Sequence, residues 1–462
     1  MSATRPALSR PALIALIAGL VIYAAGIALA SLQPAGIVLR VAAIILLAWV
    51  TAQRSSLTAW TFFAILAGAE LGADAPHIAV HLHVFAEIFL RLVRVIVAPL
   101  ILGTLTTGIA GHAQLKSLGR VALKTFIYFE VVTTLALLVG AVAINLSGAG
   151  EGVIVPPALL AQEAQPATGQ PPGIESFLLN VFPNNLASAV AQDQILQVAV
   201  FSILFGVALA LLSEEKRAPM LNLLNSLTAA MFQMTKLIMY FAPIAAGAAL
   251  AYTVGSMGVG TLFPLAKLLI TFYGAALALT LFVFVPVALL ARVSVRGFAN
   301  AVSEPAAIGF ATSTSESALP LAMERIEEFG VPRWIVSFVI PSGYSFNMTG
   351  SSLYLSTASI FAAQVAGVHL TFTEQAVMLL TLMLTSKGIA GVPRATLMIL
   401  LATAASFSLP TAPILMILGV DALIDMGRTA LNVIGNCLAA AVVARWEKAS
   451  STETEPIMSG MS

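Results

Sequence analysis

Long apolar runs recur along the whole chain and limit its possible folds more than any other feature. Ten runs are long enough to cross a bilayer as helices, near residues 12–31, 36–52, 58–74, 84–110, 119–146, 192–212, 222–251, 261–291, 334–364 and 413–446. Hydrophobic residues make up 59% of the 462 and charged residues only 9%, whereas charged residues form about 25% of an average soluble protein. The sequence therefore predicts an all-α polytopic membrane protein.

Lysine and arginine residues occur in alternate connections between these runs. They precede the first run, follow the second, and return after the fourth, the sixth, the eighth and the last. The connections 147–191, 252–260 and 365–373 contain neither residue. Because cytoplasmic loops are enriched in both, we expect ten full crossings of the cell inner membrane with both termini in the cytoplasm. Arg40, at the start of the second run, is the exception to this pattern.

Three apolar segments are interrupted by polar residues. ATSTSESALP breaks residues 299–328 and TSKGIAGVPRAT breaks residues 374–409. The Lys/Arg pattern survives only if both segments are re-entrant hairpins, the first entering from the cytoplasm and the second from outside; two kinked spans are the alternative. PSGYSFNMTGSSLY interrupts the ninth run, and such a break exposes carbonyl oxygens that suit a cation. Gly343 and Asn347 mark this candidate cation region, with a helix kink repaired by hydroxyls as the alternative.

The last run carries a polar stripe. Its spacing places the stripe residues within an arc of about 80° on a helix; they are Asp421, Asp425, Arg428, Asn432 and Asn436. Ionisable side chains at membrane depth usually face a bundle interior and mark a substrate or ion path. A structural ion pair between two helices is the alternative. No role for Asp421 follows from the sequence.

Four motifs in order, TSTSESALP, NMTGS, SKGIAGVP and DMGRTALNVIGN, resemble those of the dicarboxylate/amino acid:cation symporters, which include bacterial glutamate carriers and the excitatory amino acid transporters. The resemblance covers about residues 58–448. It implies a glutamate-transporter-like fold with eight core spans and two opposed hairpins, an elevator motion and a homotrimer. The implied scaffold is roughly 56–118 and 190–255, and the transport domain roughly 119–147 and 260–448. Residues 1–55 would add two extra helices, and 449–462 a disordered cytoplasmic tail.

The resemblance also implies a substrate site between the hairpin tips and the last helix. Arg428 matches the arginine that pairs with the substrate's side-chain carboxylate, and Asp425 matches the aspartate that holds its amino group. The other implied substrate contacts are Thr429, Asn432, Thr349 and Ser351, together with the hairpin residues Ser313, Thr314, Ser315, Gly388, Ala390, Gly391 and Val392. One arginine beside one aspartate favours L-glutamate or L-aspartate. C4-dicarboxylates and neutral amino acids, possibly with sodium coupling, are the alternatives.

Three positions depart from the sodium-coupled pattern of the resembled family. Thr349 and Asn436 stand where sodium users carry aspartates, and Lys387 stands where they carry an uncharged residue. A sodium ion leaving water needs anionic ligands to offset its desolvation, so proton coupling is expected instead. The candidate proton carriers are Glu316 and Glu130. Lys387 could act as a tethered cation or extend to the interface, Glu130 could be a structural acid, and Glu316 could be a solvated tip residue.

The sequence favours neither a cofactor nor a metal. Cys437 is the sole cysteine, and no HExxH motif is present, which disfavours an intramembrane enzyme. His77, His81 and His83 lie in a short connection and are more typical of an interfacial loop than of a metal cluster. Two opposed hairpins favour a carrier over a passive channel. The expected partners are the lipid bilayer, a small acidic amino acid and protons, with no nucleic acid.

Overall fold

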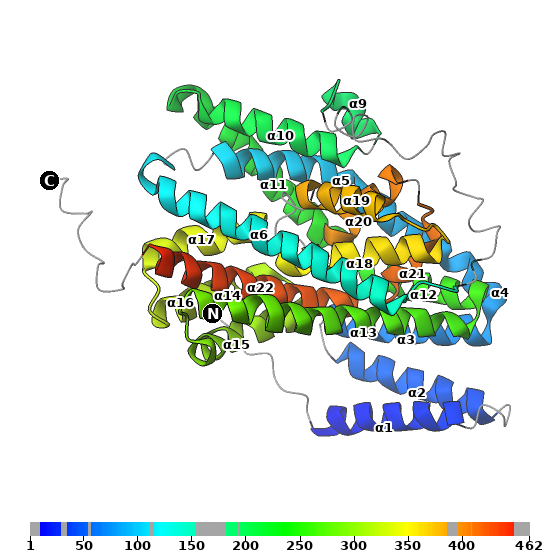
Figure 1. The fold of residues 1–462 in the computed structure, drawn as a ribbon. Helices are drawn as coiled ribbons and strands as arrows, with labels where there is room; N and C mark the ends of the chain where they lie inside the picture. Colours follow the sequence, from blue (N-terminus) through cyan, green and yellow to red (C-terminus); the bar gives the residue numbers. More distant parts are fainter. Residues whose placement is uncertain are drawn as a thin grey trace. The chain divides into compact units, whose positions relative to one another are not determined.

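The computed structural model describes residues 10–28, 35–53, 57–110, 115–153, 155, 179, 182–192, 194–385, 395–407 and 409–447. Every regular element among these residues is a helix (Figure 1). The chain divides into two compact units, Met1–Glu87 with Tyr240–Val259, and Ile88–Met239 with Gly260–Ser462. The all-helical expectation is therefore confirmed for the described part of the chain.

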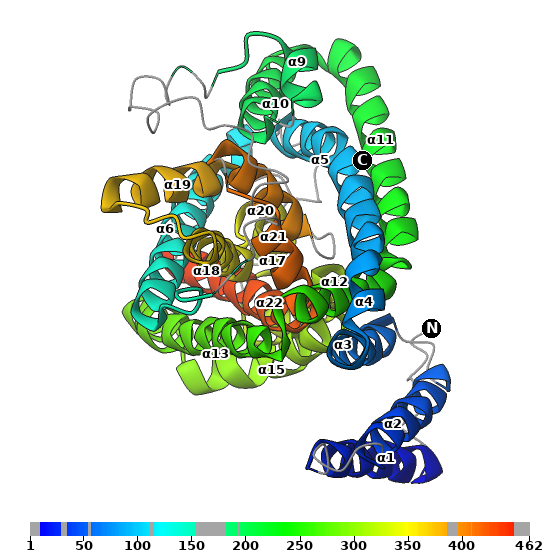
Figure 2. The same cartoon turned by 90° about the vertical axis from the view of Figure 1, so that its right-hand side faces the viewer.

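The first unit contains α1, α2, α3, α4 and α12, which are Arg10–Ala28, Ala35–Ala52, Leu57–Asp74, Pro76–Ala79 and Ala242–Met257. Helices α1 and α2 lie side by side (Figures 1 and 2). Helices α3 and α12 approach so closely that a Cβ added at Gly68 would overlap the carbonyl oxygen of Gly247. Small residues of this kind allow two membrane helices to pack backbone against backbone.

The second unit begins within α5 (His83–Ala110) and continues through α6 (Leu115–Ser147), α9 (Leu186–Ala191), α10 (Ile195–Ala210) and α11 (Glu214–Met239). One expectation is wrong here, because the run 222–251 does not form a single helix. α11 ends at Met239 and α12 begins at Ala242, with Pro243 in its first turn. Proline has no amide hydrogen to donate and is favoured at the start of a helix, which explains the break.

The run 261–291 forms α13 (Leu262–Leu279), a π-helical turn (Thr280–Phe284) and α14 (Val285–Leu290). The two helices α15 (Val295–Thr312) and α16 (Ser315–Glu328) follow and pack against each other as a hairpin. Their turn is at Ser313, whose φ of 53° is left-handed, and Arg325 of α16 pairs with Glu304 of α15 at 2.7 Å. The interruption expected in residues 299–328 is therefore a helical hairpin.

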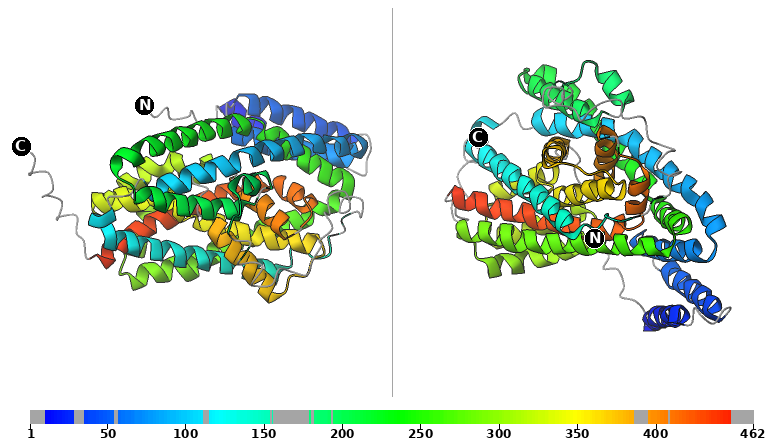
Figure 3. Two further views of the ribbon diagram at one scale, coloured as in Figure 1. Left: turned by 90° about the horizontal axis from the view of Figure 1, so that it is seen from above. Right: turned by 45° about the vertical axis from the view of Figure 1, so that its right-hand side comes forward.

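The C-terminal part contains α17 (Arg333–Phe346), α18 (Thr349–Val365), α19 (Phe372–Thr385), α20 (Ala395–Ser406), α21 (Ala412–Leu418) and α22 (Asp421–Trp446). The expected break of the ninth run is confirmed at Asn347 and Met348. The last run, 413–446, was expected as one helix, and this is wrong because Gly419 and Val420 separate α21 from α22. α22 packs against α13, α15, α17 and α18 (Figure 2), and it runs beside α13 and α6 in Figure 3.

Five helical stretches of the described residues are long and apolar enough to cross a membrane, namely Ala35–Ala52, Pro76–Thr107, Arg120–Ser147, Val259–Leu290 and Asp421–Trp446. The pair α11 and α12 adds a sixth when it is counted as one broken span. These helices support a multi-pass membrane protein. The ten crossings, the eight core spans and the re-entrant placement of the hairpins remain predictions.

Candidate functional site

The polar stripe of α22 lies inside the second unit. Its five residues are at most 3% exposed, with Asn436 fully buried. Burial of two carboxylates and a guanidinium is costly unless each charge is paired or hydrogen-bonded. The contacts of these side chains therefore show how the helix tolerates them.

Arg428 is the centre of the stripe. Its Nη2 forms an ion pair with the carboxylate of Asp425, one turn earlier on α22. Its Nη1 donates hydrogen bonds to Ser351 Oγ at 2.9 Å and to Thr396 Oγ1 at 2.5 Å. Among the described residues, its Nε has no hydrogen-bond partner. Arg428 thus links α22 with α18 and α20.

Asn432 caps the N-terminus of α18. Its Oδ1 accepts hydrogen bonds from the backbone amides of Gly350 at 2.8 Å and Ser351 at 3.3 Å, while its Nδ2 donates to Ser351 Oγ at 3.2 Å. The first amides of a helix lack partners within the helix, so a side-chain oxygen from outside stabilises them. The close approach requires a glycine, because a Cβ at Gly350 would overlap the carbonyl oxygen of Arg428. Asn432 therefore has a structural role besides the substrate contact that the resemblance implies.

The described residues of the expected cation region, Gly343, Asn347 and Asn436, form a cluster of neutral groups with Thr349. Asn347 Nδ2 donates to Asn436 Oδ1 at 2.9 Å, and the hydroxyl of Thr349 donates to Asn347 Oδ1 at 3.0 Å. A Cβ at Gly343 would overlap Asn436 Oδ1, so glycine permits this contact. The structure brings all four residues together, and none of them is a carboxylate. An amide and a hydroxyl supply dipoles to a cation here, but no negative charge.

Asp421 gains a partner that the sequence did not suggest. The hydroxyl of Tyr354, a fully buried residue of α18, donates to Asp421 Oδ1 at 2.7 Å. Asp421 also lies in the first turn of α22, where the helix dipole favours a negative charge. Asp421 therefore joins the N-terminal end of α22 to α18, one turn before Asp425.

The tip of the α15–α16 hairpin is rich in hydroxyl groups that bond to one another. Thr312 and Thr314 both contact the Ser317 hydroxyl, at 2.6 and 2.9 Å, while Ser315 is buried. The hairpin packs on α22, since a Cβ at Gly309 would lie 3.5 Å from Thr429 Cγ2. Thr429 is thus placed against the first hairpin, and its contact with substrate stays a prediction.

Several expected site residues lie outside the described part of the chain. They are Lys387, Gly388, Ala390, Gly391 and Val392 of the second hairpin, and the side chain of Glu316 is also not described. Glu130 is described, and its side chain on α6 is exposed within this chain rather than buried. Among the described residues, no group of three or more His, Cys, Asp or Glu side chains is placed so that it could hold a metal ion.

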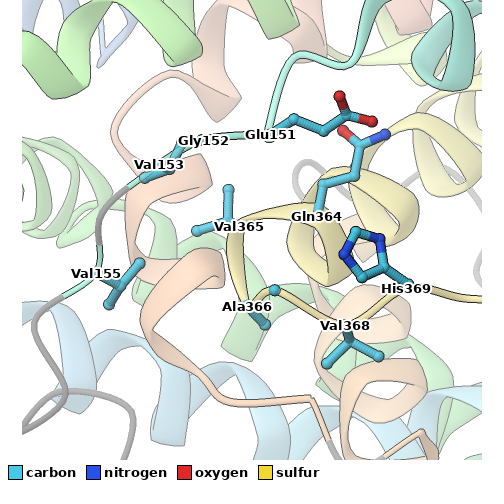
Figure 4. Close-up of a pocket in the computed structure, with 10 residues that line it drawn as sticks. Glu151, Gly152, Val153, Val155, Gln364, Val365, Ala366, Val368 and His369 are labelled. Atoms are coloured by element: carbon cyan, nitrogen blue, oxygen red, sulfur yellow. The ribbon is translucent and has the colours of Figure 1, made fainter.

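A pocket of about 400 Å³ opens where the segment after α6 meets the end of α18 (Figure 4). Glu151, Gln364 and His369 supply its polar side chains, and the Gln364 Oε1 accepts from the amide of Gly150 at 3.0 Å. None of the stripe residues lines this pocket. It is therefore a separate surface cavity, and the buried contacts of α22 define the candidate site.

Two contacts of the site were missed by the sequence reasoning. Thr396 is the last residue of the interruption TSKGIAGVPRAT, so its position in a broken segment was a usable signal. Tyr354 is likewise the last residue of the interruption PSGYSFNMTGSSLY, but nothing in that segment points to Asp421 as its partner. Its pairing with Asp421 depends on how α18 and α22 cross.

Comparison with known proteins places this arrangement in a family. The model of the sodium:dicarboxylate symporter family matches residues 57–446. The chain is 40% identical over 367 residues to the proton/glutamate-aspartate symporter of Escherichia coli, covering 78% of this chain and 84% of the relative. It is 40% identical over 407 residues to C4-dicarboxylate transport protein 2 of Mesorhizobium japonicum (86% and 91%). It is 38% identical over 398 residues to the proton/sodium-glutamate symport protein of Bacillus caldotenax (84% and 94%). The chain therefore belongs to the sodium:dicarboxylate symporter family, whose members are transporters rather than enzymes.

Proposed function

We propose that this symporter carries L-glutamate or L-aspartate together with protons. The observation that carries the proposal is the buried pair of Arg428 and Asp425, which lies on one face of α22 beside the hydroxyls of Ser351 and Thr396. This arrangement holds one fixed positive and one fixed negative charge next to each other. An acidic amino acid carries the matching groups, an extra carboxylate and an ammonium.

Exchange of partners explains why such a pair suits this substrate. Without substrate, Arg428 and Asp425 neutralise each other within the protein. An acidic amino acid offers a carboxylate to the guanidinium and an ammonium to the carboxylate, so neither buried charge is left alone. The planar guanidinium binds carboxylates through two parallel hydrogen bonds, which a lysine cannot reproduce. A C4-dicarboxylate would instead place a second negative charge near Asp425.

C4-dicarboxylate transport is the second candidate, and a specific observation favours it. Relatives named C4-dicarboxylate transport proteins match this chain at 40% identity, the same value as the relative named for glutamate and aspartate. Overall identity therefore does not separate the two substrate classes. The position of Asp425 beside Arg428 is the reason to prefer the amino acid.

The neutral cluster around Asn347 supports proton rather than sodium coupling. Thr349 and Asn436 supply a hydroxyl and an amide that already bond to Asn347. A sodium ion placed here would lose its water without gaining a carboxylate ligand, which costs several kcal/mol. Glu316 and Glu130 remain our candidate proton carriers. The exposure of Glu130 within this chain makes Glu316 the first of the two to test.

The proposed mechanism is an elevator motion. Roughly residues 119–147 and 260–448 would move as a transport domain against a scaffold of roughly 56–118 and 190–255, in a homotrimer in the cell inner membrane with both termini cytoplasmic. The tips at Ser313–Ser315 and Gly388–Val392 would close over the substrate as two re-entrant gates. The resemblance and the interrupted segments support this part of the proposal.

Uptake into proteoliposomes tests both substrate and ion. Labelled L-glutamate, L-aspartate and succinate are offered under an imposed proton gradient, then under an imposed sodium gradient at constant pH. We expect proton-driven accumulation of the two amino acids, and loss of that accumulation in Glu316→Gln or Glu130→Gln. A preference for succinate would refute the proposal that the substrate is an acidic amino acid. A requirement for sodium at constant pH would refute the proposal of proton coupling.

A further inference from the structure

Arg40 is a buried arginine in a part of the chain that lies before the family's matched region. It lies on α2, its side chain is 10% exposed, and residues 1–56 precede the match to the family model. Arg40 is also the one arginine that departs from the alternating pattern of positive charge. A charge at membrane depth needs compensation from its surroundings. The contacts of Arg40 therefore indicate what holds this helix in place.

Three nitrogens of Arg40 have partners on two other helices. Its Nε pairs with Glu70 of α3, and its Nη2 donates to both carboxylate oxygens of Asp74, at 2.8 and 3.0 Å. Its Nη1 donates to the backbone carbonyl of Gly26 in α1 at 3.4 Å. The hydroxyl of Tyr23, also in α1, donates to the second carboxylate oxygen of Glu70 at 2.8 Å. One guanidinium thus connects α1, α2 and α3.

The charges of this network depend on one another. Glu70 and Asp74 are four residues apart on α3 and therefore lie on the same face, where two negative charges repel each other. Arg40 lies between them and reduces the local charge from −2 to −1. The Glu70 side chain is only 9% exposed, while Asp74 is 28% exposed and can reach water. Without Arg40, α3 would carry a buried carboxylate with no positive partner in this network.

The packing of α1 against α2 is shaped around the stem of Arg40. A Cβ added at Gly26 would lie 2.6 Å from Arg40 Cγ and 3.0 Å from the carbonyl oxygen of Gly36. A side chain at Gly26 would therefore displace the arginine. Glycine at this position allows α1 to lie over the stem while its backbone accepts a hydrogen bond from the guanidinium.

We propose that the helix pair α1 and α2 is a stabilising element, here called the brace, which docks on the acidic face of α3 through Arg40. The face formed by Glu70 and Asp74 is an interaction surface, and its partner is a helix pair that brings one arginine and one tyrosine hydroxyl. The brace contributes to stability and holds α3, and it takes no part in substrate binding. Docking of α1 and α2 on α3 depends on the positive charge of Arg40 offsetting the negative charges of Glu70 and Asp74. Removing all three charges should therefore preserve docking better than removing the arginine alone.

Hydrogen–deuterium exchange of the full-length protein in lipid nanodiscs tests the brace. The variants are Arg40→Met, which keeps the stem and removes the charge, and the neutral triple variant Arg40→Met, Glu70→Gln, Asp74→Asn. Arg445→Met, at an exposed end of α22, is the matched control. We expect exchange in α1 and α2 to rise on the order of tenfold or more in Arg40→Met, because a buried charge is left unpaired. In the triple variant, the amides of α1 and α2 should regain most of their protection from exchange. In the Arg445→Met control, their exchange should match that of the parent.

Two further measurements keep the test decisive. If Arg40→Met cannot be recovered folded, Tyr23→Phe removes only the hydroxyl bond to Glu70 and should raise exchange in α1 by a smaller factor. Uptake per folded molecule should match the parent in Tyr23→Phe and in the triple variant. Unchanged exchange in Arg40→Met, or exchange in the triple variant as fast as in the single one, would overturn the proposal.

Discussion

Asp425→Asn separates the two substrate classes most directly. In the proposed site, Asp425 binds the ammonium of the amino acid through a buried, charge-assisted hydrogen bond, worth about 1.5–3 kcal/mol. Its loss should raise the KM for L-glutamate by about 10- to 150-fold. Arg428 keeps its contacts with Ser351 and Thr396 and loses its counter-charge. Succinate, which has no ammonium and is repelled by Asp425, should bind as well as before or better.

The assay measures KM for labelled L-glutamate and for succinate in proteoliposomes, normalised to the amount of folded protein. Asp421→Asn is the matched control, because Asp421 lies one turn earlier on the same face and bonds to Tyr354. We expect that control to affect both substrates by a similar factor. An equal loss for both substrates in Asp425→Asn, or the same change of preference in the control, would refute the assignment of the ammonium to Asp425.

Three other predictions follow from the contacts of α18 and α22. Asn432→Ala leaves two buried amides without an acceptor and should destabilise the protein by about 2–5 kcal/mol, seen as a lower melting temperature; a melting temperature equal to the parent's would contradict the cap. Gly350→Ala should prevent folding because the new Cβ overlaps a backbone carbonyl of α22, whereas Gly274→Ala, with nothing within 4 Å, should melt like the parent; normal melting of Gly350→Ala would contradict the close packing. Thr349→Asp combined with Asn436→Asp places carboxylates in the neutral cluster and should make uptake respond to sodium; sodium-independent uptake would show that the cluster is no ion site.

The structure changes the interpretation of one predicted substrate residue. Asn432 was expected to contact substrate, and its side-chain oxygen already accepts two hydrogen bonds from the start of α18. A variant at this position would therefore lose the cap and any substrate contact together. Substrate preference measured on Arg428 variants is easier to interpret, because the hydrogen bonds of Arg428 go to the side-chain hydroxyls of Ser351 and Thr396.

The sequence by itself determined the membrane class and most of the helices. Apolar runs of bilayer length leave few folds, since backbone groups in lipid must bond within their own segment. Hydropathy did not reveal the breaks before Ala242 and Asp421, because the residues around them are nearly all apolar. Hydropathy measures the free energy of transferring side chains from water to an apolar environment. It does not show where the backbone hydrogen bonds of a helix stop.

The sequence also determined the polar stripe, because the helical period alone places residues 421, 425, 428, 432 and 436 on one face. Only the tertiary structure decided their partners. Ser351 and Thr396 are 77 and 32 residues from Arg428 along the chain, and Tyr354 is 67 from Asp421. Arg40 shows the same division, since the sequence marked it as an exception and the crossing of α2 with α3 supplied its two carboxylates. The physical reason is that burial can be read from local chemistry, whereas charge compensation depends on which distant helices pack together.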